Sequence, residues 1–150
     1  MADENNREDH GGCYCGGVRF SISAGTEVAW SGYCHCEDCR RAHAAPLYHA
    51  VYVEESRFQV TAGEDLLKWY TRAEAVSDRY KRYFCGRCGS KVFSTMTEET
   101  GELRGTFPSL FDDQTIATSS TWSPREHISC AESFMDLSLI HDHLPRIQHQ

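Results

Sequence analysis

The chain has 150 residues, of which 40% are hydrophobic and 25% are charged, and its formal net charge is −7 at pH 7. This length and balance predict one small globular domain with a single core. The negative charge argues against nucleic acid as the partner, because binding its backbone needs clustered Lys and Arg. No apolar run approaches the roughly 20 residues that cross a bilayer, so we expect no membrane association.

The N-terminal residues 1–10 are polar and acidic, without the apolar stretch that a secretory signal carries. We therefore expect a disordered leader at residues 1–10, a single zinc-binding domain at residues 11–148, and a cytoplasmic protein. In a reducing compartment, closely spaced cysteines are more often metal ligands than disulfide partners.

The hydrophobic pattern along the chain has the period of a strand. At residues 18–22 apolar and polar side chains alternate, which predicts a half-buried strand. Further strands are predicted, in order, at residues 47–53, 66–70, 76–84, 92–96, 103–107, 115–118 and 127–130. One short helix is predicted at residues 37–44, and a long loop at 119–124. Such spacing favours a mainly β fold of antiparallel sheets, as a sandwich or an open barrel.

Seven of the eight cysteines fall into three close clusters. We call them the first pair (Cys13, Cys15), the triplet (Cys34, Cys36, Cys39) and the second pair (Cys85, Cys88). Two spacings are Cys-x2-Cys, which places two sulfurs on one side of a tight turn and suits tetrahedral zinc. The remaining cysteine, Cys130, stands alone, as a small packed apolar residue or as a redox thiol.

The clusters can be combined in two ways. Cys36 and Cys39 could join the second pair in a zinc ribbon, leaving the first pair and Cys34 aside. Alternatively the two pairs join and the triplet forms a three-sulfur site, which we prefer because each cluster then stays intact. Four thiolates make a closed, structural zinc site, whereas three leave the open position of a catalytic one.

These cysteines and their neighbours resemble the glutathione-dependent formaldehyde-activating enzyme family, which includes centromere protein V. The similar motifs include GCYCGGVRF at residues 12–20, CHCEDCRR at 34–41 and YFCGRCGS at 83–90. The resemblance implies a tent-like fold of β-sheets pinned by two zinc ions. It further implies that a structural zinc is held by Cys13, Cys15, Cys85 and Cys88, and a catalytic zinc by Cys34, Cys36 and Cys39.

The activity implied by the resemblance is that of a carbon–sulfur lyase. Glutathione, the co-substrate, adds to formaldehyde and gives S-(hydroxymethyl)glutathione, so the partner is a small thiol or aldehyde. The alternative is a non-catalytic zinc module that engages a protein partner. A third hypothesis, methionine sulfoxide reduction, would depend on Cys130 alone.

Several charged and titratable side chains flank the triplet. Arg40 and Arg41 are candidates for binding glutathione carboxylates, or they only offset the thiolate charge. His35 and His43 are candidates for proton transfer, because their unperturbed pKa is near neutral. His43 or Asp38 could instead be a fourth zinc ligand and close the site. A second basic cluster, between residues 79 and 87, could hold a small anion but is more simply a solvated strand face.

Overall fold

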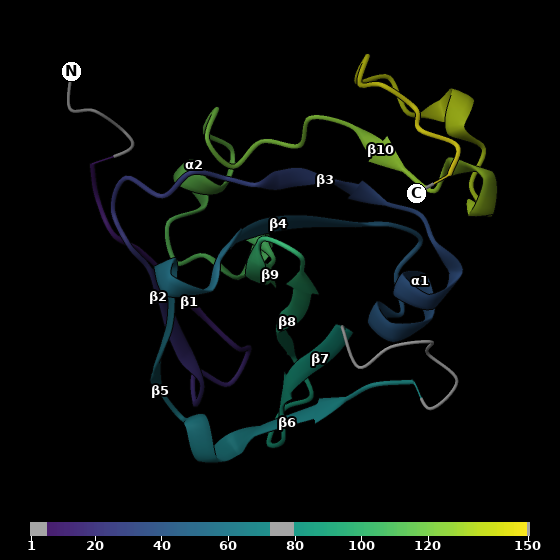
Figure 1. Cartoon of the computed structure of the whole chain (residues 1–150). Helices are drawn as coiled ribbons and strands as arrows, with labels where there is room; N and C mark the ends of the chain where they lie inside the picture. Colours follow the sequence, from purple (N-terminus) through teal and green to yellow (C-terminus); the bar gives the residue numbers. More distant parts are fainter. Residues whose placement is uncertain (1–5, 73–79, 150) are drawn as a thin grey trace.

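The computed structural model describes residues 6–72 and 80–149, and their strands form two sheets (Figure 1). The three-stranded sheet has the order β1-β2-β5 and the seven-stranded sheet the order β10-β3-β4-β9-β8-β7-β6. The strands are β1 Asp9–Gly12, β2 Arg19–Ile22, β3 Trp30–Cys34, β4 Tyr48–Glu54, β5 Phe58–Ala62, β6 Leu67–Tyr70, β7 Tyr80–Cys85, β8 Lys91–Glu98, β9 Gly101–Thr106 and β10 His127–Ile128. Apart from the parallel pair β10–β3, the paired strands are antiparallel, so the predicted mainly β fold is confirmed.

Helical segments are short. The helix α1, Glu37–His43, matches the predicted one, and Cys36 caps it by accepting a hydrogen bond from the backbone N–H of Cys39. It ends at Ala44, whose left-handed backbone (φ 49°) cannot continue a helix. The other helical segments are the single turn α2, Gln114–Ala117, and the 3-10 turns Glu55–Arg57, Glu64–Leu66, Pro108–Leu110, Cys130–Glu132 and Leu137–Leu139.

Some predicted strands differ from the structure. The strand predicted at residues 115–118 is wrong, because α2 occupies this segment and Asp113 caps its N-terminus by accepting from the Thr115 N–H. Of the strand predicted at 76–84, residues 76–79 lie outside the described residues, and β7 begins at Tyr80. The strands β1, β3 and β5 were not predicted. In β3, Gly32 interrupts the pattern, and it lets the Trp30 ring and the Glu126 carbonyl approach closer than a Cβ would allow.

The main core lies between the two sheets. The small sheet contributes Phe20, Ile22 and Phe58, and the large sheet contributes the buried Val51 and Val53 of β4, among others. The rings of Phe20 and Phe58 stack with their centroids 5.0 Å apart. Because side chains alternate along a strand, β4 turns Ala50 and Tyr52 to the opposite face, where a second cluster forms. The face of β4 that carries this second cluster also carries Tyr48, next to α1.

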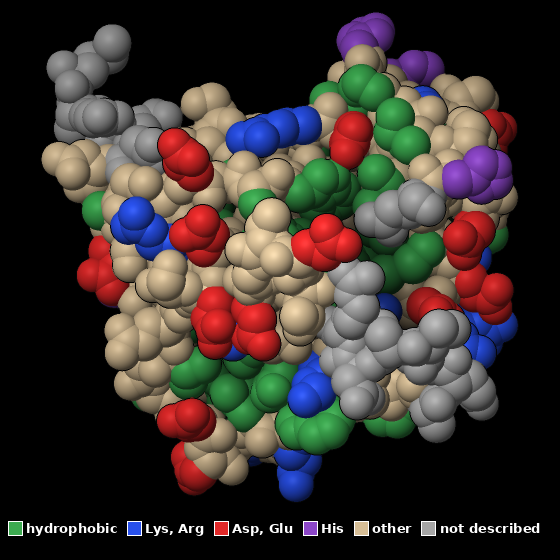
Figure 2. All heavy atoms as spheres, viewed as in Figure 1, with side chains coloured by type: hydrophobic (Ala, Val, Ile, Leu, Met, Phe, Trp, Pro, Cys, Tyr) green, Lys and Arg blue, Asp and Glu red, His purple; other side chains and the backbone are tan. Residues whose placement is uncertain are grey.

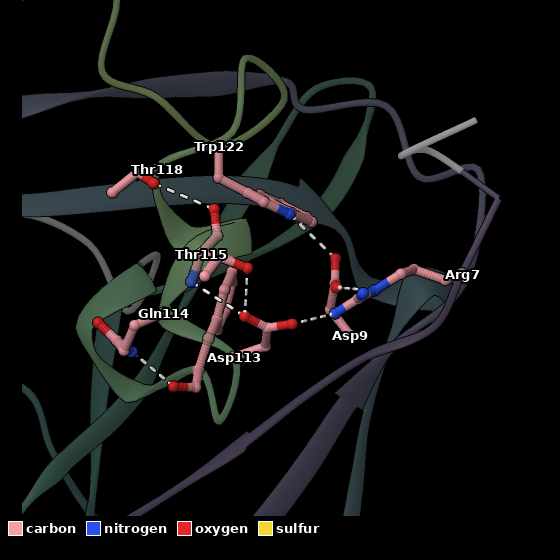
Figure 3. A network of polar contacts seen from close by, with 8 residues as sticks. Arg7, Asp9, Asp113, Gln114, Thr115, Thr118 and Trp122 are labelled. Atoms are coloured by element: carbon pink, nitrogen blue, oxygen red, sulfur yellow. Dashed lines mark hydrogen bonds and ion pairs between the residues drawn. The ribbon is translucent and has the colours of Figure 1, made fainter. Parts of the chain in front are cut away.

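The N-terminal segment is attached to the domain before residue 11. Asp9 belongs to β1 and is buried, and its carboxylate accepts a hydrogen bond of 2.9 Å from the indole N–H of Trp122 (Figure 3). Arg7 reaches from the same segment to Asp113 at 2.8 Å. Residues 7, 9 and 10 thus contact the domain that we predict to begin at residue 11.

The surface carries both signs of charge. On the face in Figure 2, acidic and basic side chains are interspersed, and no extended basic area is visible. Within residues 6–72 and 80–149, none of the helices has the length and apolar character that spanning a bilayer requires.

Candidate functional site

The first and second pairs of cysteines meet although 70 positions separate Cys15 from Cys85. The first pair lies in the turn between β1 and β2, and the second pair at the turn between β7 and β8, so each sheet contributes one turn. The four Sγ atoms lie within 4.8 Å of one another, with 3.5 Å from Cys13 to Cys15 and 3.8 Å from Cys15 to Cys85. We call this group the four-sulfur centre. It corresponds to the second of the two combinations considered above.

The turns that carry these cysteines are shaped by glycine. Gly16 and Gly89 both have the left-handed backbone that glycine adopts without strain, at φ 74° and 76°. Backbone N–H groups then point at the sulfurs: that of Val18 donates to Cys13 Sγ at 3.2 Å. The backbone N–H of Ser90, followed by that of Cys15, lowers the pKa of Cys88 to about 6. The turn thus favours the thiolate, which is the form that binds a metal.

The triplet forms a second group, the three-sulfur centre, at the junction of β3 and α1. Cys34 ends β3, Cys36 caps α1, and Cys39 lies in its first turn, where its N–H donates to Cys36 Sγ at 3.3 Å. The three Sγ atoms lie within 4.8 Å of one another. Within the described part of the chain, no further Cys, His, Asp or Glu ligand atom joins this group. Hydrogen bonds from the thiols of Cys34 and Cys36 hold the pKa of Cys39 well below its ordinary value.

Both groups fit zinc by ligand chemistry, and the four-sulfur centre also fits it by its sulfur–sulfur distances. A tetrahedral zinc with Zn–S bonds of about 2.3 Å places its sulfurs about 3.8 Å apart. The two sulfur–sulfur distances measured at the four-sulfur centre are close to this value. Thiolate ligands also select zinc over harder cations such as Mg²⁺ and Ca²⁺. The four-sulfur centre can saturate the metal, whereas the three-sulfur centre can leave one position open.

Residues 8–132 match the family described as glutathione-dependent formaldehyde-activating enzyme. The match includes all seven clustered cysteines and covers most of the chain. The chain belongs to this family. The resemblance seen in the sequence motifs is therefore confirmed, and the cysteine centres are those of a formaldehyde-activating family member.

A solved structure supports the fold of this family member. The crystal structure of a Rhodobacter sphaeroides protein superimposes with a TM-score of 0.53 and 23% sequence identity. The match covers 69% of this chain and 87% of the bacterial chain. At this identity the likeness shows the shared fold alone.

The candidate His43 lies near the three-sulfur centre but does not belong to its ligand group. Its ring stacks on that of Tyr48, with centroids 4.2 Å apart, and it meets Phe107 edge-on. Burial, and then the charge of Arg82, lowers the pKa of His43 to about 4, so the ring is neutral at pH 7. Asp38, the other candidate fourth ligand, is exposed and pairs with Arg72.

The candidates for contacting glutathione, Arg40 and Arg41, lie on α1 and already have partners. Arg40 donates to the backbone oxygens of His35 and Glu132, at 2.9 Å each. Arg41 pairs with Glu37 at 2.8 Å, with 77% of its side chain exposed. Both line an open groove of about 290 Å³, together with Ala44, Ala45, Pro46 and Phe134. Arg41 is thus the freer of the two to exchange its partner for a ligand.

Two residues that contact the three-sulfur centre were missed. The Tyr48 hydroxyl donates to Cys39 Sγ at 3.3 Å, and Arg82 Nη2 lies 3.7 Å from the same sulfur. Arg82 belongs to the basic cluster that we interpreted as a solvated strand face, and for this half-buried residue that interpretation is wrong. In the sequence, the sign that Arg82 is partly buried is that it lies between two aromatic residues of the strand, Tyr80 and Tyr83. This pattern alone does not identify Cys39 as its neighbour.

A buried chain of hydrogen bonds supports the loop that carries the triplet. His127 Nε2 lies 2.7 Å from Asp142, His127 Nδ1 lies 2.8 Å from His35 Nε2, and His35 Nδ1 lies 3.0 Å from the Ser133 hydroxyl. Burial opposes ionisation of Asp142, but hydrogen bonds from His127 and others outweigh it and lower its pKa. With Asp142 ionised, these distances fit a chain in which the Ser133 hydroxyl donates to His35, His35 donates to His127, and His127 donates to the carboxylate. His35, flanked by two triplet cysteines, is thus held from the C-terminal segment.

The isolated Cys130 lies away from both centres. It is 5% exposed and begins a 3-10 turn, and its backbone N–H donates to the Ile147 carbonyl at 3.0 Å. Burial raises the pKa of its thiol, which keeps the less reactive neutral form at pH 7. These surroundings are those of a packed small apolar residue.

Proposed function

We propose that this protein is a zinc-dependent carbon–sulfur lyase that forms or cleaves an adduct between glutathione and an aldehyde, S-(hydroxymethyl)glutathione being the simplest. The observation that carries the proposal is the three-sulfur centre of Cys34, Cys36 and Cys39, whose group includes no fourth ligand from the described residues. Membership in the formaldehyde-activating family supports this reaction class.

The proposal assigns two zinc ions to each chain. Cys13, Cys15, Cys85 and Cys88 would hold the structural ion, and the triplet would hold the catalytic one. A zinc ion bound by three thiolates supplies a Lewis acid that favours the thiolate form of an incoming thiol. We place the protein in the cytoplasm, where a reducing environment keeps these cysteines available as ligands.

The protein's own groups then prepare the reaction. Tyr48 and Arg82 donate to the sulfur of Cys39 and so fix its position and offset part of its charge. When the substrate sulfur attacks the aldehyde carbon, the C–S bond forms and the π electrons of C=O move to oxygen. That oxygen takes up the proton given up by the thiol. Cleavage of the adduct reverses these steps.

The surface beside α1 offers contacts for the rest of glutathione. The groove next to Arg40 and Arg41 is open to solvent, and Arg41 can exchange its exposed pairing with Glu37 for a substrate carboxylate. Neutral His43 is suited to accept a hydrogen bond from substrate rather than to donate a proton. These roles of Arg40, Arg41 and His43 belong to the proposal.

The direct test measures exchange between formaldehyde, glutathione and their adduct by NMR in the zinc-loaded protein. We expect exchange faster than in buffer and two zinc ions per chain. In the cobalt-substituted protein, glutathione should shift the absorption of the three-sulfur centre. No acceleration over buffer, together with no spectral shift, would contradict the proposal.

A non-catalytic zinc module that engages a protein partner is the second candidate. It is favoured by exposed apolar side chains: Phe134, which lines the groove, is 68% exposed, and Leu139 is 72% exposed. The substitution Cys36→Ser separates the two. In a catalyst the variant should lose turnover and keep its fold on the four-sulfur centre, whereas in a non-catalytic module the wild type already shows no turnover for the variant to lose.

A further inference from the structure

The guanidinium of Arg82 lies beside the three-sulfur centre and is only partly used by the protein. Its Nη2 contacts Cys39 Sγ at 3.7 Å, and the group lies over the ring of Tyr80 at 4.5 Å. Its Nη1 is buried and has no hydrogen-bond partner among the residues that the structure describes. Within residues 6–72 and 80–149, no ion pair with a carboxylate involves this arginine.

An unpartnered buried donor requires an explanation. Leaving such a group unsatisfied destabilises the fold, and more so when the group is charged. Offsetting the charge of the thiolates explains the contact of Nη2 with Cys39 but not the unpartnered Nη1. Because both nitrogens are attached to the same carbon, Nη1 lies in the immediate neighbourhood of the three-sulfur centre. A ligand at this centre would find a fixed donor there.

The orientation of the guanidinium is held by a chain of hydroxyl groups. The Tyr80 hydroxyl donates to Ser94 at 2.9 Å and lies 2.8 Å from the Tyr52 hydroxyl. These contacts fix the ring over which the guanidinium of Arg82 lies. A donor held in place before the reaction stabilises developing charge without reorganising, which is the most effective arrangement for electrostatic catalysis.

We propose that Arg82 is a catalytic residue whose Nη1 donates a hydrogen bond to the substrate oxygen that becomes negatively charged as the C–S bond forms. This inference rests on the proposed lyase function. Glutathione carboxylates lie several bonds from the sulfur, whereas Arg82 touches a sulfur of the centre and so faces the reacting end of the substrate. Arg82 stays protonated throughout, and the alkoxide takes its proton from the thiol by way of water.

The test compares Arg82→Gln and Arg82→Lys with the matched control Lys81→Gln. Lys81 is the preceding residue of β7, and its charge lies over the Trp69 ring at 4.7 Å, away from Cys39. We expect Arg82→Gln to keep two zinc ions and to lower kcat by about 10²–10³-fold, the effect of removing one such donor. Arg82→Lys keeps the positive charge but loses the paired N–H donors of the guanidinium, so its kcat should stay at least about tenfold below that of the wild type. Lys81→Gln should leave kcat unchanged.

A binding measurement provides a readout independent of turnover. The cobalt-loaded protein is titrated with mercaptoacetate, which carries an anionic oxygen close to its sulfur, and with ethanethiol, which carries none. We expect the wild type to prefer mercaptoacetate and Arg82→Gln to lose that preference while binding ethanethiol as before. Glutathione and its diester form the second arm. If Arg82→Gln loses only the preference for glutathione over its diester, Arg82 contacts a remote carboxylate of the substrate, and the inference is overturned.

The remaining outcomes separate this inference from the lyase proposal. The role of Arg82 is overturned if the turnover of Arg82→Gln equals that of Lys81→Gln, or if it falls only in proportion to lost zinc. Either outcome leaves the lyase proposal standing. If Arg82→Gln does not fold, full turnover of Arg82→Lys overturns the inference in the same way. A wild type that binds no thiol at cobalt and shows no turnover overturns both.

Discussion

Both cysteine centres offer sulfur atoms as ligands, but they differ in which parts of the chain supply these sulfurs. The four-sulfur centre joins turns of two sheets, and its sulfurs are surrounded by glycines and backbone N–H groups. The three-sulfur centre is drawn from the six residues 34–39, and its neighbours are side chains: Tyr48 and Arg82 both reach Cys39. The first arrangement cross-links distant segments, whereas the second gathers functional groups around one local loop.

From this contrast we expect the four-sulfur centre to stabilise the fold and the three-sulfur centre to serve the reaction. A metal that joins two sheets contributes its binding free energy to folding, because the unfolded chain does not hold the ligands together. A metal on one short loop constrains little of the chain, so its removal should spare the fold. The following predictions test that contrast, beginning with the largest effect.

Substituting Cys85→Ser should have the largest effect on stability. It removes a ligand from the four-sulfur centre, and we expect a loss of about 5 kcal/mol or more, since structural zinc in small domains contributes roughly 10–16 kcal/mol. Thermal unfolding and zinc content measure it. Cys130→Ser is the matched control, a buried cysteine outside both centres. If Cys85→Ser and Cys130→Ser destabilise the protein equally, the structural role assigned to the four-sulfur centre is contradicted.

Substituting Cys36→Ser should affect activity and largely spare stability. We expect one zinc per chain to be lost and turnover to fall by at least about a hundredfold, while the unfolding free energy changes by less than about 2 kcal/mol. Adduct exchange by NMR and thermal unfolding of the same sample give both quantities. Unfolding as severe as that of Cys85→Ser would show that the three-sulfur centre is structural as well.

The buried chain of hydrogen bonds behind the triplet should affect the zinc affinity of the three-sulfur centre only. Asp142→Asn removes the charged end of the chain through His127 and His35. We expect zinc affinity at this centre to fall by about 10–100-fold, the usual effect of changing a group that orients a metal site. Competition with a chromophoric chelator measures it. Asp136→Asn, an exposed carboxylate of the same segment, should leave both affinities unchanged, and an equal fall at both centres would contradict the prediction.

The smallest effect concerns acid stability that does not depend on metal. Burial lowers the pKa of His49 in β4 to about 4, against an unfolded value of about 6.5. Between these values the unfolded chain binds a proton that the folded chain does not, so stability falls as pH drops from 6.5 to 4. The contribution of His49 to this slope should approach about 1.4 kcal/mol per pH unit. His49→Gln should make this part of the profile flatter than in the wild type in denaturant titrations of the zinc-loaded protein, and an unchanged slope would contradict the prediction.

Much of the fold was predictable where local patterns decide. The strand predicted at residues 18–22 follows from alternation, and this strand and the helix predicted at 37–44 both appear within one or two residues. The segment 115–118 was mispredicted because its composition suits a strand, while the cap at Asp113 and packing of Ala117 in the core favour a helical turn. The strand β3 escaped prediction because its centre, Ser31 and Gly32, is buried between two neighbouring strands and shows no alternation.

The sequence by itself determined the chemistry of this protein: which cysteines are clustered, that they suit zinc, and which family the motifs resemble. The spacing of neighbouring residues is enough for this, because each cluster lies in one turn. Only the tertiary structure decided which clusters meet and what surrounds them. Arg82 reaches Cys39 across 43 positions of sequence, and Cys15 meets Cys85 across 70. Such contacts depend on the register and curvature of sheets built from distant strands, and no local pattern encodes that geometry.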